Sequence, residues 1–190
     1  MSMKKLLIIS ISICCGYLGV SQKHSGVFPY IDGKIHFTKV VTVDSSIGKE
    51  TLIKNAIIWF EKTTTDYNNS INNKESYGLK DNTILKNINT GEFVGTLNMI
   101  VQQSLSQSLI GFDVYIYAKD GKYKYDFTDF KYLGNSLENK MAGRNMNSVT
   151  SMESADKSRF KKLMALIYKS CLSAIEKLNE QMVKQSLADF

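Results

Sequence analysis

Hydrophobic residues recur at two spacings along this chain, and the spacing separates expected strands from expected helices. Residues Lys34–Val43 are rich in β-branched side chains, which favours a strand, and Asp32-Gly33 before them marks a turn. From Lys49 to Thr63 apolar residues recur every three or four positions, the spacing of a helix with one buried face. Ser45 and Ser46 are candidates to cap this helix.

Four further strands are expected to form two consecutive hairpins. The first joins residues 82–89 to 92–103 around Thr90-Gly91, and the second joins 109–119 to 122–133 around Asp120-Gly121. Asp-Gly tolerates the positive φ angles of a type I′ turn, whose twist matches the strands that it connects. A two-residue turn fixes the register of the second hairpin, beginning with Lys119 opposite Lys122.

A last, long helix is expected from about Met152 to Ala188. Thr150 and Glu153 have the spacing of a capping box at its start. One face carries apolar residues at steps of three or four: Phe160, Leu163, Ile167, Cys171, Ala174, Leu178 and Met182. The polar segments 66–81 and 134–151 are expected to be surface loops, and 104–108 a short connection.

This order of elements predicts an α+β fold with the sequence strand, helix, four strands, helix. Consecutive hairpins make the sheet mainly antiparallel, with about five strands and both helices on one face. The chain shows no internal repeat, and 43% hydrophobic and 22% charged residues are ordinary for a globular protein. We expect one domain over residues 33–190, after a lead-in segment at 22–32.

Residues 1–21 have the three parts of a secretion signal in order. Lys4 and Lys5 give a positive start, an apolar run covers residues 6–15, and small residues lead to a cleavage site after Ser21. The run is too short to span a bilayer. We therefore expect an exported protein that is periplasmic, outer-membrane-associated or secreted. The alternatives are a buried first helix, or a lipoprotein acylated at Cys14 or Cys15, although neither cysteine follows a small residue.

Net charge is modest once this signal is set aside. The full chain carries +6, and losing Lys4 and Lys5 leaves 22 − 18 = +4. This charge does not favour a nucleic-acid partner, which would need cations clustered on one face. The basic cluster that opens the last helix is expected to be a solvated turn or to make weak contact with an anionic surface. It consists of Lys157, Arg159, Lys161 and Lys162.

Three segments together resemble a known bacterial family. They are the strand G-K-I-x-F-x-K-V-V (Gly33–Val41), the helix text I-W-F (Ile58–Phe60) and the hairpin K-D-G-K-Y-K-Y-D-F-T-D-F (Lys119–Phe130). Behind an export signal they resemble domain-of-unknown-function family 4468, over roughly residues 33–133. The resemblance implies a fold like that of the TATA-box-binding protein (TBP), but it implies no activity and no DNA binding, since fold does not fix function.

The second hairpin supplies the candidate binding surface. Its register places Val114, Ile116 and Ala118 opposite Phe127, Tyr125 and Tyr123 on one apolar face, which should lie against the helices. The other face carries tyrosines, which combine a large rigid surface with a hydrogen-bonding tip, and lysines. The candidate residues are Tyr115, Tyr117, Lys119, Lys122 and Lys124. An ordinary solvated strand face explains the same pattern.

Candidate catalytic chemistry is sparse, and no cofactor is expected. His24 and His36 have no metal-ligand spacing, and Cys171 falls on an apolar helix face, which favours a small buried residue over a nucleophile or an intermolecular disulfide. Asp126 and Asp129 alternate in a regular strand, so they do not form a local carboxylate pair. No glycine-rich phosphate loop or G-x-S-x-G elbow occurs.

Taken together, the sequence favours a non-enzymatic binding module that uses its open sheet face. The expected partner is an envelope protein or a glycan. One alternative is a structural envelope subunit that docks through the last helix, from Phe160 to Met182, on a partner or on another copy. A less favoured alternative is a hydrolase whose site assembles from distant residues. The oligomeric state stays open.

Overall fold

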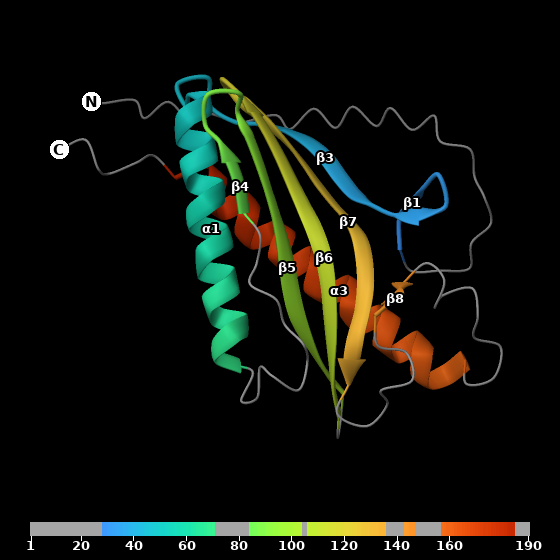
Figure 1. The fold of residues 1–190 in the computed structure, drawn as a ribbon. Coiled ribbons are helices and arrows are strands. Elements are labelled where there is room, and N and C mark those ends of the chain that lie inside the picture. The colour runs from blue at the N-terminus through green and yellow to red at the C-terminus, as the bar shows by residue number, and fades with distance from the viewer. Residues whose placement is uncertain (1–27, 71–83, 104–105, 136–142, 147–156, 185–190) are drawn as a thin grey trace, which may run out of the picture.

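The computed structural model describes residues 28–70, 84–103, 106–135, 143–146 and 157–184, which form one sheet backed by two helices (Figure 1). The strands are β1 (Tyr30–Ile31), β2 (Lys34–Ile35), β3 (Phe37–Thr42), β4 (Ile84–Asn87), β5 (Glu92–Gln103), β6 (Ser106–Lys119), β7 (Lys122–Asn135) and β8 (Arg144–Asn145). The helices are α1 (Lys49–Ser70) and α3 (Lys157–Met182).

The main sheet is antiparallel and has the order β3-β7-β6-β5-β4. β8 pairs with the far part of β7, and β1 with β2 forms a separate small hairpin. The predicted α+β fold with two helices and a mainly antiparallel sheet is confirmed. The strand that precedes α1 joins the sheet at its edge, beside β7, which local sequence patterns alone do not specify.

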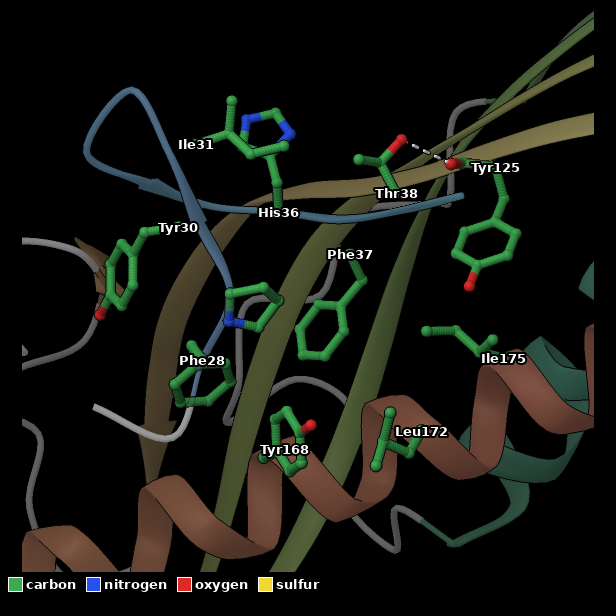
Figure 2. Close-up of a pocket in the computed structure, with 11 residues that line it drawn as sticks. Phe28, Tyr30, Ile31, His36, Phe37, Thr38, Tyr125, Tyr168, Leu172 and Ile175 are labelled. Carbon is green, nitrogen blue, oxygen red and sulfur yellow. Dashed lines mark hydrogen bonds between the residues drawn. The ribbon is translucent and has the colours of Figure 1, made fainter. Parts of the chain in front are cut away.

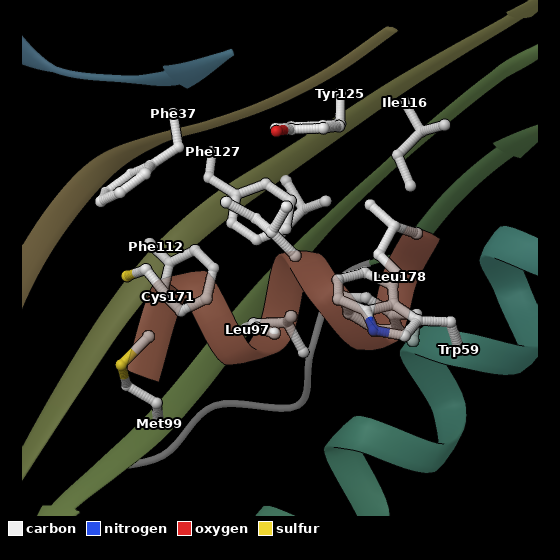
Figure 3. Packing of buried hydrophobic residues seen from close by; sticks show 14 of the residues in the cluster. Phe37, Trp59, Leu97, Met99, Phe112, Ile116, Tyr125, Phe127, Cys171 and Leu178 are labelled. Atoms are coloured by element: carbon white, nitrogen blue, oxygen red, sulfur yellow. The ribbon is translucent and has the colours of Figure 1, made fainter. Parts of the chain in front are cut away.

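Both helices cover the same face of the sheet and also contact each other (Figure 1). Between the layers lies a continuous hydrophobic core that is rich in aromatic rings (Figure 3). Trp59 of α1 stacks on Phe127 with ring centroids 5.9 Å apart, and Phe112 stacks on Phe130 at 5.0 Å. Cys171 is fully buried in this core, and burial raises the pKa of its thiol. The expectation of a small buried residue is confirmed.

Several element ends differ from the sequence prediction. α1 continues to Ser70, beyond the predicted end at Thr63 and into the predicted loop, because residues 64–70 contain neither Gly nor Pro to stop a helix. β6 begins at Ser106, inside the predicted connection, because its first residues continue the ladder with the end of β5. β7 continues to Asn135, and β8 lies within the predicted loop 134–151. The Thr150–Glu153 capping box lies outside the described residues.

The first predicted strand is broken in two at His36. The N–H of His36 donates to the carbonyl oxygen of Pro29 at 3.1 Å, and the turn at Asp32-Gly33 folds β1 back on β2. Both turn residues have positive φ, 49° and 75°. Of the predicted strand, only the β3 part therefore pairs with β7, and the rest folds into the small β1–β2 hairpin.

Candidate interaction site on the open sheet face

The β6–β7 hairpin has the register that its two-residue turn predicts. Lys119 pairs with Lys122, Tyr117 with Lys124 and Tyr115 with Asp126. The alternate residues form the helix-covered face and are buried: Val114, Ile116, Ala118, Tyr123, Tyr125 and Phe127. The predicted division of the hairpin into a buried face and an open face is confirmed.

The tip of this hairpin is fixed to the start of α1. The carboxylate of Asp120 accepts a hydrogen bond from the N–H of Lys49 at 2.7 Å, and the N–H of Gly121 donates to the carbonyl oxygen of Ile47 at 3.1 Å. Asp120 thus caps the helix, in place of the predicted Ser45 or Ser46, which lie before its first turn. Gly121 has φ of 70°. Glycine adopts this φ without strain, and the two hydrogen bonds hold the turn against the start of α1.

A shallow hollow of about 390 Å³ lies beside this tip. Its lining comes from four strands and a turn: Val40, Thr90, Gly91, Glu92, Tyr117, Ala118, Lys119, Lys122, Tyr123 and Lys124. Four of the five predicted binding residues take part, namely Tyr117 and the three lysines. Tyr117 is 42% exposed and Val40 60% exposed, so both belong to the small set of exposed large apolar residues in the described chain.

Three lysines gather at this hollow. Among the described residues, none of Lys119, Lys122 and Lys124 forms an ion pair with a carboxylate. Glu92 is the acidic residue in the lining, and its carboxylate accepts a hydrogen bond from the Thr90 hydroxyl at 3.3 Å. A surface with exposed aromatic rings and unpaired lysines suits a partner that carries carboxylate or other anionic groups.

Tyr115 belongs to a different part of the open face. It does not line the hollow, and its strand partner is Asp126. Burial, followed by the nearby carboxylates of Asp113 and Asp129, raises the pKa of Tyr115. The structure therefore separates Tyr115 from the other four predicted residues.

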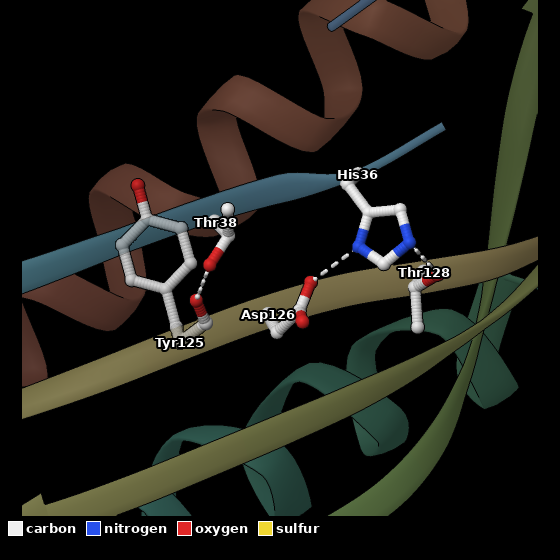
Figure 4. A network of polar contacts seen from close by, with 5 residues as sticks. All are labelled: His36, Thr38, Tyr125, Asp126 and Thr128. Carbon is white, nitrogen blue, oxygen red and sulfur yellow. Dashed lines mark hydrogen bonds and ion pairs between the residues drawn. The ribbon is translucent and has the colours of Figure 1, made fainter. Parts of the chain in front are cut away.

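A chain of polar contacts runs across β7 near Tyr115 (Figure 4). Nδ1 of His36 lies 3.0 Å from a carboxylate oxygen of Asp126, and Nε2 lies 3.1 Å from the hydroxyl of Thr128. The sequence showed no partner for His36, because its partners come from a strand about 90 residues away. The available signal was weak: Asp126 and Thr128 are two residues apart on one expected strand, so their side chains lie on the same face.

The same order of groups, hydroxyl, imidazole and carboxylate, activates hydroxyl nucleophiles in hydrolases. Here the Thr128 side chain is buried, at 7% exposure, and lines neither described hollow. Within the described chain, these contacts join His36 and Thr38, at the start of the edge strand, to β7. We therefore assign them a structural role.

A regular strand would place Asp126 and Asp129 on opposite faces, because they are three residues apart. β7 is not regular here. Asp129 has φ of 53°, where the pairing of β6 with β7 shifts by a residue between Gly111 and Asp113. The bulge places the Asp129 carboxylate close enough to raise the pKa of Tyr115, as does the carboxylate of Asp126, which is the regular strand partner of Tyr115. The prediction of strict alternation was wrong at this point, because sequence patterns do not reveal the bulge.

A second, larger hollow of about 690 Å³ lies on the other side of the sheet edge, between β3 and α3 (Figure 2). Phe37 and Tyr125 point from the sheet toward Tyr168, Leu172 and Ile175 of the helix (Figure 2). Leu172 is 44% exposed, and so is Ile31 at the end of the groove. The sequence pattern predicts no site here, because the groove needs the pairing of β3 with β7.

The remaining sequence candidates contribute less. Lys161 and Lys162 are exposed on α3, while the side chains of Lys157 and Arg159, and all of His24, lie outside what the structure describes. No cluster of three metal-ligating side chains occurs among the described residues. In the same part of the chain, neither helix combines the length and apolar content that crossing a membrane requires.

Two solved structures share this fold. A DUF4468 family protein from Bacteroides ovatus aligns with a TM-score of 0.61 and 11% identity, covering 86% of this chain and 94% of that one. A TBP-like protein from Parabacteroides distasonis also aligns with a TM-score of 0.61, at 13% identity, covering 81% of this chain and 96% of that one. No curated protein matches the chain.

A family model covers the sheet and its first helix, from the start of β3 to near the end of β7. The match spans residues 37–133, about half of the chain, and includes the hairpin that carries the candidate site. The resemblance found in the sequence is confirmed. This chain belongs to the family described as a domain of unknown function (DUF4468) with TBP-like fold.

Proposed function

We propose that this protein is exported and binds an anionic partner in the cell envelope through the hollow at the β6–β7 tip. The observation that supports this most is the combination of an exposed Tyr117 with Lys119, Lys122 and Lys124, which form no ion pair with a described carboxylate. Tyrosine provides contact area and a hydrogen-bonding tip, and the lysines attract and orient an anionic group.

Rigidity of the support strengthens the proposal. Gly91 has φ of 76°, and its carbonyl oxygen accepts a hydrogen bond from the N–H of Ala118 at 2.8 Å, which joins the β4–β5 turn to β6. Lys49 of α1 donates from Nζ to the carbonyl oxygen of Asn89 at 2.6 Å. A preorganised surface binds a partner with little entropy lost in ordering its own backbone.

The alternative of a structural subunit docking through the last helix meets one constraint. The apolar face from Phe160 to Met182 packs into the core of its own chain, with Leu163, Ile167 and Leu178 buried. Docking through α3 would have to use the opposite side, where Leu172 is exposed. This version has fewer supporting features than the hollow, and we rank it second.

Charge reversal tests the proposed site. The triple variant Lys119→Glu/Lys122→Glu/Lys124→Glu should lose binding to poly-L-glutamate and to polygalacturonate, measured by biolayer interferometry at two salt concentrations. The matched control reverses the exposed Lys54, Lys62 and Lys177 on the helices, which gives the same net charge. Equal loss in both variants would show attraction by net charge alone and would contradict the site. The polymer that the native protein prefers separates a polypeptide partner from a glycan.

Export has its own test. Expression of the full chain in Bacteroides ovatus, the source of one of the similar structures, should yield a mature chain that begins at Gln22 in the envelope fraction or the medium. Fractionation followed by mass spectrometry of the mature protein measures this. An intact Met1 in the cytoplasmic fraction would contradict export, and a lipid on Cys14 or Cys15 would identify a lipoprotein.

A further inference from the structure

The outer edge of β3 presents backbone groups with no partner among the described residues. The N–H of His36 points away from β7 to Pro29, whereas the N–H of Val43 points inward to the carbonyl oxygen of Gly121. Backbone direction alternates along a strand, so the N–H and C=O groups of Thr38, Val40 and Thr42 all point outward. An unpaired edge of this kind is a template for another strand.

These three residues can pair with the same residues of a second, antiparallel copy of the strand. An antiparallel pairing about Val40 places Val40 opposite Val40 of the partner strand, and Thr38 opposite Thr42, so that every outward group meets another. On the open face the contacts are then between β-branched side chains, which pair favourably across strands. On the helix side Lys39 stands opposite Val41, so no charge directly faces a like charge.

The neighbouring symmetric registers are poorer. A shift of the axis to Lys39 places two lysines directly opposite each other, which is unfavourable. A shift to Val41 places Thr38 opposite Asp44, beyond the end of the strand, and loses part of the ladder. The register centred on Val40 is thus the one that uses the whole free edge.

We propose that β3 pairs antiparallel with β3 of a second copy of this chain, about a twofold axis at Val40, and joins the two sheets into one. Such a contact is closed, because the same strand serves both copies and no edge of this type remains free. Val40, which is 60% exposed in the single chain, is covered at the axis. Val40 also lines the hollow at the β6–β7 tip, but the pairing does not require the anionic partner, which is bound through Tyr117 and the lysines.

The groove under β3 gives independent support. Leu172 and Ile31, both 44% exposed, flank the same edge of the molecule, and the partner strand would lie above the groove (Figure 2). The twofold axis brings the grooves of the two copies to one seam. Removal of these apolar side chains from water adds a favourable contribution that a bare edge would lack.

Solution mass tests the pairing. Protein purified after processing by the expressing cell should show twice the chain mass in sedimentation equilibrium, and Val40→Pro should halve it. Proline is tolerated where the N–H faces outward on an edge strand, and circular dichroism verifies the fold. Ile58→Lys, at a residue of α1 that is 49% exposed, should stay dimeric. A monomer at every concentration, or a dimer that Val40→Pro leaves intact, would overturn the proposal.

Crosslinking tests the register. In the proposed dimer the Cα atoms of the two copies of residue 40 lie about 5.5 Å apart, within disulfide range, so Val40→Cys should form a disulfide dimer under mild oxidation. Thr38→Cys is the matched control: its own copy lies about 14 Å away, and it should not crosslink. Equal crosslinking at both positions would overturn this register. Tyr117→Ala should leave the mass unchanged, which separates failure of this proposal from failure of the partner site.

Discussion

The two faces of this sheet differ in how many of their side chains find contact partners within the protein. On the helix-covered face of β7, Tyr123, Tyr125 and Phe127 are buried among rings and aliphatic groups. On the open face the same strand presents Lys124 and Asp126. The side chains of the covered face stabilise the fold. On the open face the number of contacts within the chain falls along the strand, from the hydrogen-bonded His36 end to the exposed hairpin tip.

That gradient suggests where a partner would bind. At the His36 end, carboxylates and hydroxyls meet partners within the chain, and the Thr96 hydroxyl donates to Asp113 at 2.7 Å in the same region. At the hairpin tip the lysines have no described carboxylate partner. Substitutions along this gradient should therefore cost progressively less folding stability, while their effect on binding increases.

The largest loss of stability is expected for Phe127→Ala on the covered face. Phe127 is fully buried and contacts Trp59, Phe112 and Tyr125 through its ring. Truncation removes apolar contact and leaves a cavity, which should lower the free energy of unfolding by about 3–5 kcal/mol. Urea denaturation followed by circular dichroism measures it. A loss below about 1 kcal/mol would show that the two layers pack more loosely than these ring contacts indicate.

At the bonded end of the open face, His36→Ala should cost less, about 1–2 kcal/mol. The imidazole and the Asp126 carboxylate are each about one-fifth exposed, so the groups left behind recover some hydration. A double-mutant cycle with Asp126→Ala separates the pair from the individual residues. Strictly additive losses would mean that the His36–Asp126 contact contributes nothing to stability.

Tyr125 provides a pH-dependent comparison between the faces. Burial raises the pKa of its phenol in the folded protein, so the folded state disfavours the ionised form. The contribution of Tyr125 to folding stability is complete below the pKa of the unfolded state, near 10, and is lost as pH rises through the higher pKa of the folded state. Between about pH 9 and 11, Tyr125→Phe should lose less stability than the native protein. Parallel decline of both proteins in urea titrations would contradict this assignment.

Sequence patterns predicted what is local and missed what depends on long-range pairing. The Asp120-Gly121 turn fixes the pairing of β6 with β7, so the two faces of the hairpin follow from the order of its residues alone. The position of β3 beside β7 does not, because a helix and three strands separate them along the chain. For that reason Val40 in the hollow, the partners of His36 and the groove below β3 were all missed.

Helix ends show a similar limit. The apolar spacing of α1 stops at Phe60, but the backbone continues to Ser70, because hydrogen bonds and not side-chain pattern carry a helix onward. The cap at its start comes from Asp120, on a turn 71 residues later. Local patterns identify candidates for capping, whereas the folded topology decides which oxygen reaches the first turn.

The smallest effect on stability, and the largest on binding, is expected for Tyr117→Ala at the exposed tip. The side chain is 42% exposed, and its removal should change the free energy of unfolding by less than about 0.5 kcal/mol. Loss of an aromatic contact at the centre of a binding surface should weaken binding of the preferred anionic polymer roughly tenfold or more. Tyr30→Ala, a half-buried tyrosine of the β1–β2 hairpin, is the control in the same interferometry assay. Equal binding by native protein and Tyr117→Ala would place the partner elsewhere. The groove between β3 and α3 would then be the next surface to test, because it combines exposed apolar side chains with the free edge of the sheet.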